Sequence, residues 1–174
     1  MRKGLIHIYY GDGKGKTTCA LGMALRALGN GLRVQLYQFL KDAPSGEIEA
    51  LKRFERAEVF RAGAGCGKFL WQMDREERET FLAAQRRLLH RACACAVDSR
   101  ADLLILDEIL SAGDAIGPQE ILELLSRRAP EIEIVLTGHQ APPALLAAAD
   151  YVTFLQKQKH PYDRGVSARR GIEY

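Results

Sequence analysis

Short apolar segments alternate with longer amphipathic ones along most of the chain. The apolar segments predict strands at residues 5–10, 33–39, 58–61, 103–106, 132–137 and 151–155. Helical spacing of apolar positions predicts helices at residues 16–28, in a short segment that ends near Phe54, after Asp74, at 118–128 and at 142–149. This alternation is typical of an α/β fold with an open, mostly parallel, doubly wound sheet. Ligands of such sheets bind in the loops at the carboxyl ends of the strands.

The longest predicted helix has a defined start. Asp74 is a suitable N-cap residue, and Glu77 lies three positions later, as in a capping box. Apolar side chains then recur with a period near 3.6, at Phe81, Leu82, Leu88, Leu89 and Ala92. We therefore expect one face of this helix to pack on the sheet.

The composition is that of an ordinary globular protein. Of the 174 residues, 47% are hydrophobic and 27% charged, so we expect one domain over residues 1–174 with a core of its own. A net charge of +3 is too small to indicate a nucleic-acid groove. The apolar run at residues 5–10 is too short for a signal peptide or a membrane span. These features predict a cytoplasmic protein that binds neither nucleic acid nor membranes.

The cysteines do not form a recognisable metal or redox motif. Cys19, Cys66, Cys93 and Cys95 show no C-x-x-C spacing. Cys93 and Cys95 lie two positions apart in a predicted helix, so their side chains point in different directions. We expect the cysteines to be reduced and mostly buried.

A glycine-rich loop follows the first predicted strand and leads into the first predicted helix. Its residues are Gly11, Asp12, Gly13, Lys14, Gly15, Lys16, Thr17 and Thr18. This is the context of a phosphate-binding P-loop, in which backbone amides, a lysine and a helix N-terminus surround phosphate oxygens and a hydroxyl binds Mg²⁺. Lys16 and Thr17 are therefore candidates for phosphate and metal binding. The strict motif begins with glycine at the position of Tyr10, so the loop is a variant.

Two carboxyl groups follow the apolar strand at residues 103–106. Asp107 and Glu108 should lie beside the phosphate loop, because both segments end at the carboxyl edge of the sheet. Either carboxylate could bind a metal ion directly or through water, and Glu108 could instead orient a polar group as a catalytic residue. Without the neighbouring phosphate loop, an acidic helix cap would be the simpler interpretation.

Motifs over nearly the whole chain resemble those of the P-loop type ATP:corrinoid (cob(I)alamin) adenosyltransferase family. They are GDGKGKTT at 11–18, QFLK at 38–41, FLW at 69–71, LDE at 106–108, LTG at 136–138, AD at 149–150 and KHPYDRGVSARRGIEY at 159–174. The C-terminal stretch is the most specific of them. Three positions depart from the family pattern: Tyr10 replaces a small residue, Asp42 a glycine, and His139 an arginine.

The resemblance implies a RecA-like P-loop domain that forms a homodimer. It also implies that ATP, bound with Mg²⁺ or Mn²⁺ and with unusual polarity in the loop, donates its 5′-deoxyadenosyl group to the cobalt of a reduced corrinoid substrate and releases triphosphate. A flavin-dependent protein is the implied electron donor. Lys16 and Glu108 are the implied catalytic residues, and Thr17, Asp107 and Glu108 the implied metal ligands.

Phe69 and Trp71 are the residues that the resemblance places near the corrinoid. Aromatic side chains facing cobalt would exclude an axial ligand and make the cobalt easier to reduce. The alternative is that both residues anchor their glycine-rich loop in the core. His160 could coordinate cobalt, but a histidine before Pro161 is more often a hydrogen-bonded turn residue, and we do not assign it as a ligand.

Two other functions are compatible with the phosphate loop. A P-loop ATPase or small-molecule kinase would use Glu108 to orient water or substrate and would release ADP. A non-catalytic carrier of corrinoid or nucleotide would bind without turnover. The C-terminal motif disfavours the first alternative, and the phosphate loop combined with the LDE sequence disfavours the second.

Overall fold

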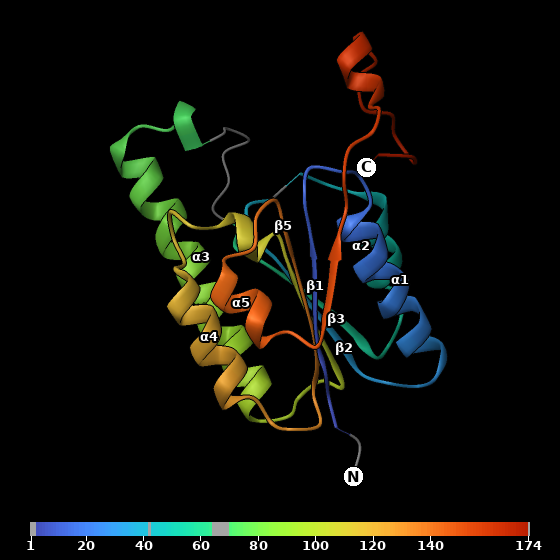
Figure 1. Ribbon diagram of the computed structural model, residues 1–174, viewed down its shortest axis with the longest axis vertical. Helices are drawn as coiled ribbons and strands as arrows, with labels where there is room; N and C mark the ends of the chain where they lie inside the picture. Colours follow the sequence, from blue (N-terminus) through green and yellow to red (C-terminus); the bar gives the residue numbers. More distant parts are fainter. Residues whose placement is uncertain (1–2, 42, 64–69, 174) are drawn as a thin grey trace.

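Six parallel strands form one sheet in the computed structural model, which describes residues 3–41, 43–63 and 70–173 (Figure 1). The strands are β1 (Ile6–Tyr10), β2 (Val34–Gln38), β3 (Ala57–Arg61), β4 (Leu103–Asp107), β5 (Glu133–Gly138) and β6 (Tyr151–Phe154). Their order across the sheet is β3-β2-β4-β5-β1-β6, and every neighbouring pair is parallel. The expected α/β sheet is therefore confirmed, and within the described residues it is entirely parallel.

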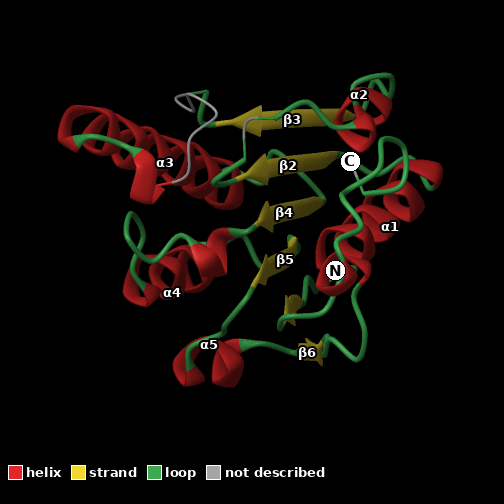
Figure 2. Ribbon diagram, turned by 90° about the horizontal axis from the view of Figure 1, so that it is seen from above, coloured by secondary structure: helices red, strands yellow, loops and turns green. Residues whose placement is uncertain are grey.

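Helices cover both faces of the sheet. Helices α1 (Lys16–Gly29) and α2 (Gly46–Leu51) lie on one face, while α3 (Arg75–Val97), α4 (Pro118–Arg127) and α5 (Pro143–Ala148) lie on the other (Figure 2). The part of the chain that the structure describes also contains three short 3₁₀ helices: η1 (Leu70–Gln72), η2 (Ile109–Ser111) and η3 (Pro161–Arg164). This doubly wound arrangement is RecA-like, as the apolar pattern and the resemblance predicted.

The central position of β4 in the sheet explains why its first four residues, 103–106, are all apolar. All five of its residues are buried, because helices cover the sheet on both sides. Leu104 and Leu106 belong to the core on the α3–α4 side, whereas Leu103 and Ile105 belong to the core on the α1 side. Successive side chains of a strand point to opposite faces of the sheet, and here both faces are covered by apolar cores.

The carboxyl ends of β1, β2, β4 and β5 lie at one edge of the sheet. The register places Gln38 of β2 opposite Asp107 of β4, and Tyr10 of β1 opposite Gly138 of β5. The segment after β6 rises from the same edge and returns towards the start of α1 (Figure 1). Polar residues from distant parts of the sequence therefore meet here.

The expectation of mostly buried cysteines is wrong for two of the three that the structure describes. Cys19 is exposed on the first turn of α1, Cys93 is half-buried, and Cys95 is buried under α3; Cys66 lies outside the described residues. Cys19 is exposed because the buried face of α1 is formed by Lys16, Ala20, Ala24 and Leu28, and position 19 lies beside it. Burial raises the pKa of the Cys95 thiol to about 11.

No helix in the described ranges is long and apolar enough to cross a bilayer.

His7 lies on β1 and connects it to other strands. Its Nε2 lies 2.6 Å from the Glu133 carboxylate, and its ring stacks on Tyr151. The contacts of His7 therefore join β1 to β5 and β6, its two neighbouring strands. His90 is exposed on α3.

The start of α3 is fixed by the predicted capping box. The Asp74 carboxylate accepts the Glu77 N–H at 2.9 Å, and the Glu77 carboxylate accepts the Asp74 N–H at 3.1 Å. We predict that Asp74→Ala lowers the free energy of unfolding by about 0.5–2 kcal/mol, because amides of the first helical turn lose their acceptor. Asp74→Asn, which retains an acceptor, should lose less. Equal urea midpoints for wild type and Asp74→Ala would contradict a stabilising cap.

Candidate active site

The loop at residues 11–15 is shaped by close packing against the chain that follows β6. Gly11 has φ 121°, and a β-carbon there would come 2.3 Å from the carbonyl oxygen of Leu155. A β-carbon on Gly13 would come 2.7 Å from the same oxygen, which accepts the Gly13 N–H at 2.8 Å. Gly15 has φ 112° and precedes α1 directly. Glycine is therefore required both by backbone conformation and by contact with Leu155.

Lys16 places its ammonium group inside this loop. Its Nζ donates to the carbonyl oxygens of Gly11 at 2.7 Å and Gly13 at 2.9 Å, and the residue is buried. The first turn of α1 contains no acidic residue. The amides of Lys16, Thr17 and Thr18 precede the first hydrogen bond of the helix, from the Cys19 N–H to the Gly15 carbonyl, and so have no acceptor within it. A buried cation beside a helix N-terminus is suited to bind a polyphosphate.

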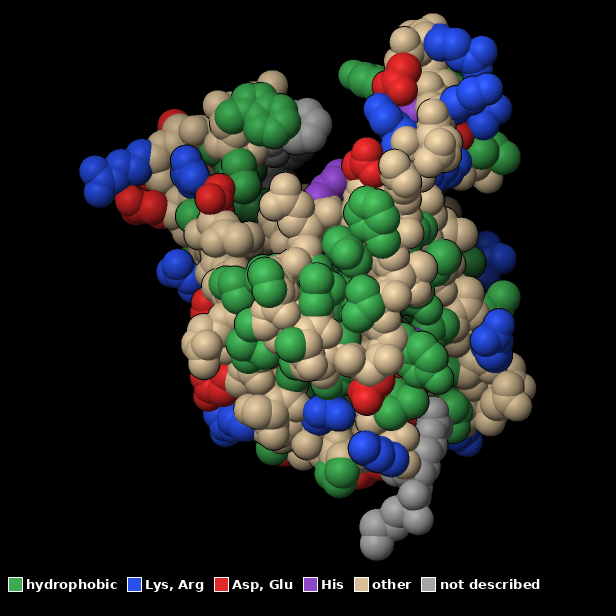
Figure 3. Space-filling view, viewed as in Figure 1, with side chains coloured by type: hydrophobic (Ala, Val, Ile, Leu, Met, Phe, Trp, Pro, Cys, Tyr) green, Lys and Arg blue, Asp and Glu red, His purple; other side chains and the backbone are tan. Residues whose placement is uncertain are grey.

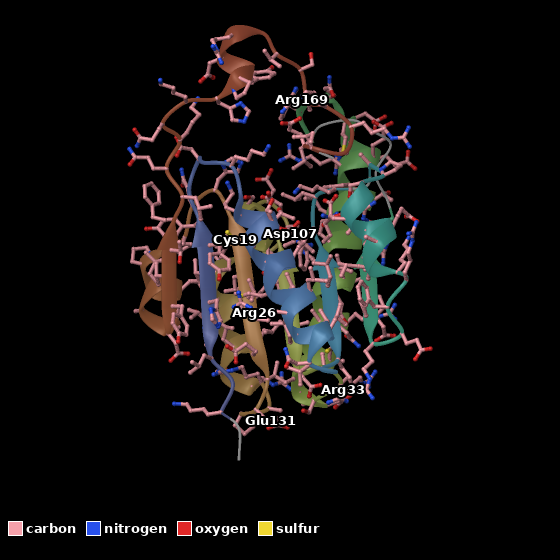
Figure 4. The ribbon with its side chains drawn as sticks, turned by 90° about the vertical axis from the view of Figure 1, so that its right-hand side faces the viewer. Cys19, Arg26, Arg33, Asp107, Glu131 and Arg169 are labelled. Carbon is pink, nitrogen blue, oxygen red and sulfur yellow. The ribbon has the colours of Figure 1, made fainter. Side chains whose placement is uncertain are left out.

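Asp107 is the point at which four elements meet at the carboxyl edge. Its side chain is fully buried, and its Oδ1 accepts the Thr17 hydroxyl of α1 and the Thr137 hydroxyl of β5, each at 2.8 Å. Its Oδ2 accepts the Gln38 amide of β2 at 3.1 Å. Figure 4 shows Asp107 near the first turn of α1, at the end of the sheet opposite Arg33 and Glu131. The sequence predicted this proximity, and the structure brings Thr17 and Asp107 into direct contact.

Glu108 adopts a backbone conformation that is uncommon outside glycine. Its φ is 62°, its N–H donates to the Thr137 hydroxyl at 2.8 Å, and its carboxylate accepts the Ser111 hydroxyl at 2.9 Å. Left-handed backbone at a non-glycine residue is strained, and such strain concentrates at functional sites. The bond to Thr137 holds the backbone of Glu108, and the bond from Ser111 holds its carboxylate beside Asp107.

The ammonium group of Lys41 faces the side-chain oxygen atoms of Thr17, Asp107 and Glu108. Its Nζ lies 3.6 Å from the Asp107 carboxylate, 3.5 Å from the Glu108 carboxylate and 3.5 Å from the Thr17 hydroxyl. Leu40, immediately before it, also has left-handed backbone, with φ 60°, and its N–H donates to the Gln85 side chain. This turn directs the lysine back over the end of β4.

The same oxygen atoms fit the chemistry of a divalent cation. Mg²⁺ prefers hydroxyl, carboxylate and phosphate oxygens, and Thr17, Asp107 and Glu108 already surround one cationic group, the Lys41 ammonium. No group of three or more His, Cys, Asp or Glu side chains in the described part of the chain is placed to hold a metal ion.

A cleft of about 630 Å³ lies over the phosphate loop. It is lined by the loop and the first turns of α1, by Lys41, Glu47 and Glu108, and by the C-terminal residues Gly171, Ile172 and Glu173. The volume of this cleft is within the range of ligand-binding sites.

Figure 3 shows a hollow at the carboxyl edge between two projections, η1 with the start of α3 and the C-terminal segment.

Trp71 lies on η1, in the projection before α3. It is 78% exposed, so the interpretation of Trp71 as a core anchor is wrong. Phe69, its proposed companion, and Asp42, one of the departures from the family pattern, lie outside the described residues. An exposed tryptophan in this projection is available to contact a large apolar ligand.

The remaining residues singled out in the sequence have structural explanations. Tyr10 packs its ring against Phe154 at a centroid distance of 5.1 Å, joining β1 to β6. His160 caps η3, since its Nδ1 accepts the Tyr162 N–H at 3.2 Å, which supports the turn interpretation. His139 is exposed, and its backbone N–H donates to the Ser111 hydroxyl at 3.0 Å.

Several polar residues that form the site had no predicted binding or catalytic role. Gln38, Lys41 and Thr137 lay within quoted motifs, and Ser111 in none, yet all four contact Asp107, Glu108 or both. The available signal was their position at or shortly after the carboxyl ends of three neighbouring strands, β2 for Gln38 and Lys41, β5 for Thr137 and β4 itself for Ser111. Their partners could not be deduced, because strand order is not encoded in local pattern.

Comparison with known proteins identifies the family. Residues 2–174 match the family described as ATP:corrinoid adenosyltransferase BtuR/CobO/CobP. The chain belongs to this family. A corrinoid adenosyltransferase from Escherichia coli (strain K12) is 35% identical over 176 residues, which cover 99% of this chain and 86% of the relative.

Other relatives give the same result. The corrinoid adenosyltransferase CobA from Salmonella typhimurium (strain LT2) is 33% identical over 176 residues, covering 99% of this chain and 86% of that protein. A corrinoid adenosyltransferase from Pseudomonas aeruginosa is 33% identical over 175 residues, covering 99% and 84%. The resemblance drawn from the motifs is thereby confirmed, and members of the family are enzymes.

The Thr137 hydroxyl connects the two acidic residues of the site, since it donates to Asp107 and accepts from Glu108. We predict that Thr137→Val lowers the free energy of unfolding by about 1–3 kcal/mol, because the buried Asp107 oxygen loses a donor and the Glu108 amide loses its acceptor. Thr137→Ser keeps the hydroxyl and should lose only the smaller contribution of one methyl group. Equal stability of the Val and Ser variants in urea titrations would show that the hydroxyl makes no net contribution.

Proposed function

We propose that this protein transfers the 5′-deoxyadenosyl group of ATP to the cobalt of a reduced corrinoid and releases triphosphate. The observation that carries the proposal is the family match over residues 2–174, which includes both the phosphate loop and the C-terminal motif. The buried Lys16, the helix N-terminus and the cleft above them provide a site of suitable size and charge for the triphosphate of ATP.

The transfer is a nucleophilic displacement at the ribose C5′ carbon. The electron pair of cobalt(I) forms the cobalt–carbon bond, the bond between C5′ and oxygen breaks, and its electron pair leaves on the triphosphate. Because cobalt(I) is already a strong nucleophile, the protein needs no catalytic base. Its contributions are to position C5′ and to stabilise the charge on the leaving group.

We assign that stabilisation to the phosphate loop. Lys16 is the catalytic cation, and the loop at 11–18 supplies amide donors and the Thr17 hydroxyl. We propose that Thr17, Asp107 and Glu108 hold Mg²⁺ or Mn²⁺ together with the phosphates. Such an ion would neutralise phosphate charge during displacement. Glu108 is also assigned as a catalytic residue that fixes the ion and ATP relative to each other.

Phe69 and Trp71 are proposed to form the wall that faces the cobalt. The exposure of Trp71 beside the hollowed carboxyl edge supports this role over packing. A water-excluding aromatic wall would disfavour an axial ligand on cobalt(II) and so ease its reduction to cobalt(I).

Assembly, electron supply and location are proposed from the family resemblance. We propose that residues 1–174 form one domain, that two copies form a homodimer, and that a flavin-dependent protein reduces the corrinoid in the cytoplasm. Neither nucleic acid nor a membrane is part of this proposal.

The direct test is anaerobic incubation with ATP, Mg²⁺ and chemically reduced corrinoid. We predict that adenosylated corrinoid, followed by its absorption spectrum, and intact triphosphate, followed by ³¹P NMR, appear in equal amounts. Lys16→Ala is the control for the site and should lower kcat/KM about 10²–10³-fold, because the leaving group loses its buried cation. Stoichiometric ADP would instead identify an ATPase or kinase.

Trp71→Ala separates cobalt chemistry from general binding. Reaction that starts from cobalt(II) with a weak flavin reductant should fall much more than reaction that starts from preformed cobalt(I), because only the first depends on loss of the axial ligand. The melting temperature should change little, since the side chain is 78% exposed. Equal loss of rate in the reactions that start from cobalt(II) and from cobalt(I) would show that Trp71 does not assist the reduction of cobalt.

A further inference from the structure

The C-terminal segment is attached to the phosphate loop at both of its ends. At its start, the Leu155 carbonyl accepts the Gly13 N–H at 2.8 Å, and the Lys157 N–H donates to the Asp12 carboxylate at 3.1 Å. At its end, the Glu173 carboxylate lies 3.2 Å from the Lys14 ammonium. Three successive residues of the loop therefore bond to one segment, which leaves the carboxyl edge and returns to it (Figure 1).

The two attachments differ in kind. The first uses backbone groups and packs Leu155 against glycines that admit no side chain, so it is built into the fold. The second is an ion pair whose Lys14 side chain is 52% exposed. Exposed ion pairs contribute little to stability and are screened by salt. The end of the segment is therefore held by a contact that another anion can replace.

Residues 169–173 form a hydrogen-bonded turn, here called the hook, that presents the Glu173 carboxylate. The Arg169 guanidinium donates to both carboxylate oxygens of Glu173, at 3.2 and 3.0 Å, and the backbone N–H of Arg169 donates to one of them at 2.7 Å. The Glu173 N–H returns to the Arg169 carbonyl at 2.9 Å, in a turn that includes Gly171 at φ 79°. Figure 4 shows Arg169 above the carboxyl edge, on the side of Asp107.

Protonation does not open this contact near neutral pH. The hydrogen bonds from Arg169 lower the pKa of Glu173 to about 2. Because this folded-state pKa lies below the ordinary value, the contact is fully present above the ordinary pKa and is lost only as the pH falls towards 2. Near neutral pH a competing anion at Lys14, rather than protonation of Glu173, therefore releases the hook.

We propose that the hook is a latch over the phosphate cleft, with Glu173 occupying Lys14 until the polyphosphate chain of ATP takes its place. The identity of the anion rests on the proposed function, whereas the latch itself rests on the contacts above. Glu173, Ile172 and Gly171 line the cleft beside the loop, so an anion that enters there meets Glu173 directly. Glu173 is a positioning residue in this proposal, since it acts on ATP through Lys14.

The test is calorimetric binding of inorganic triphosphate at low ionic strength. Competition predicts that Glu173→Gln binds triphosphate about two- to fivefold more tightly than wild type, because Lys14 is no longer engaged. Asp163→Asn is the matched control. It removes the same charge from the same segment, but its carboxylate pairs with Lys157 rather than with the loop, so its affinity should equal that of wild type.

Two further measurements test whether tighter triphosphate binding by Glu173→Gln arises from release of Lys14. The gain from Glu173→Gln should disappear in a Lys14→Gln background and should shrink at high salt. Unchanged or weaker binding by a folded Glu173→Gln protein would overturn the latch, as would an equal gain in Asp163→Asn. Triphosphate binding needs neither corrinoid nor turnover, so failure of the adenosyl-transfer assay would leave this result intact, and the reverse also holds.

Discussion

The site depends on one buried carboxyl group at the end of the central strand. Asp107 accepts hydrogen bonds from α1, β5 and β2 at once, and no other residue described here joins as many elements at this edge through one side chain. A fully buried carboxyl group must have partners, because an unsatisfied one costs several kcal/mol. The need to satisfy Asp107 thus fixes the first turn of α1, and with it the phosphate loop, relative to the sheet.

The residues around this group are held in conformations that only tertiary contacts can maintain. Leu40, two residues after β2, and Glu108, directly after β4, both have left-handed backbone, and each is held by a hydrogen bond from its N–H to a side chain. These turns bring Lys41 and the Glu108 carboxylate over Asp107. The strands β2, β4 and β5 support this strain, so the Lys41 ammonium and the Glu108 carboxylate are held at the carboxyl edge of the sheet.

The sequence predicts the framework well, because periodicity reports burial directly. The apolar run at 103–106, the capping box at Asp74 and the glycine-rich loop each correspond to the observed element. Exposure was predicted less well, as Cys19 shows, since it depends on which helix face meets the sheet. The partners of Lys41 and the return of Glu173 to Lys14 depend on strand order and chain path, so no local pattern could have predicted them.

A double-mutant cycle on ATP affinity tests the organising role of Asp107 most directly. Asp107→Asn, Thr17→Val and the double variant would be compared with wild type by calorimetry in the presence of Mg²⁺, after each variant is shown to be folded. If Asp107 acts by holding Thr17 and the loop, the two losses overlap, with a coupling free energy of about 0.5–3 kcal/mol. Strictly additive losses, or wild-type affinity in folded Asp107→Asn, would contradict the account.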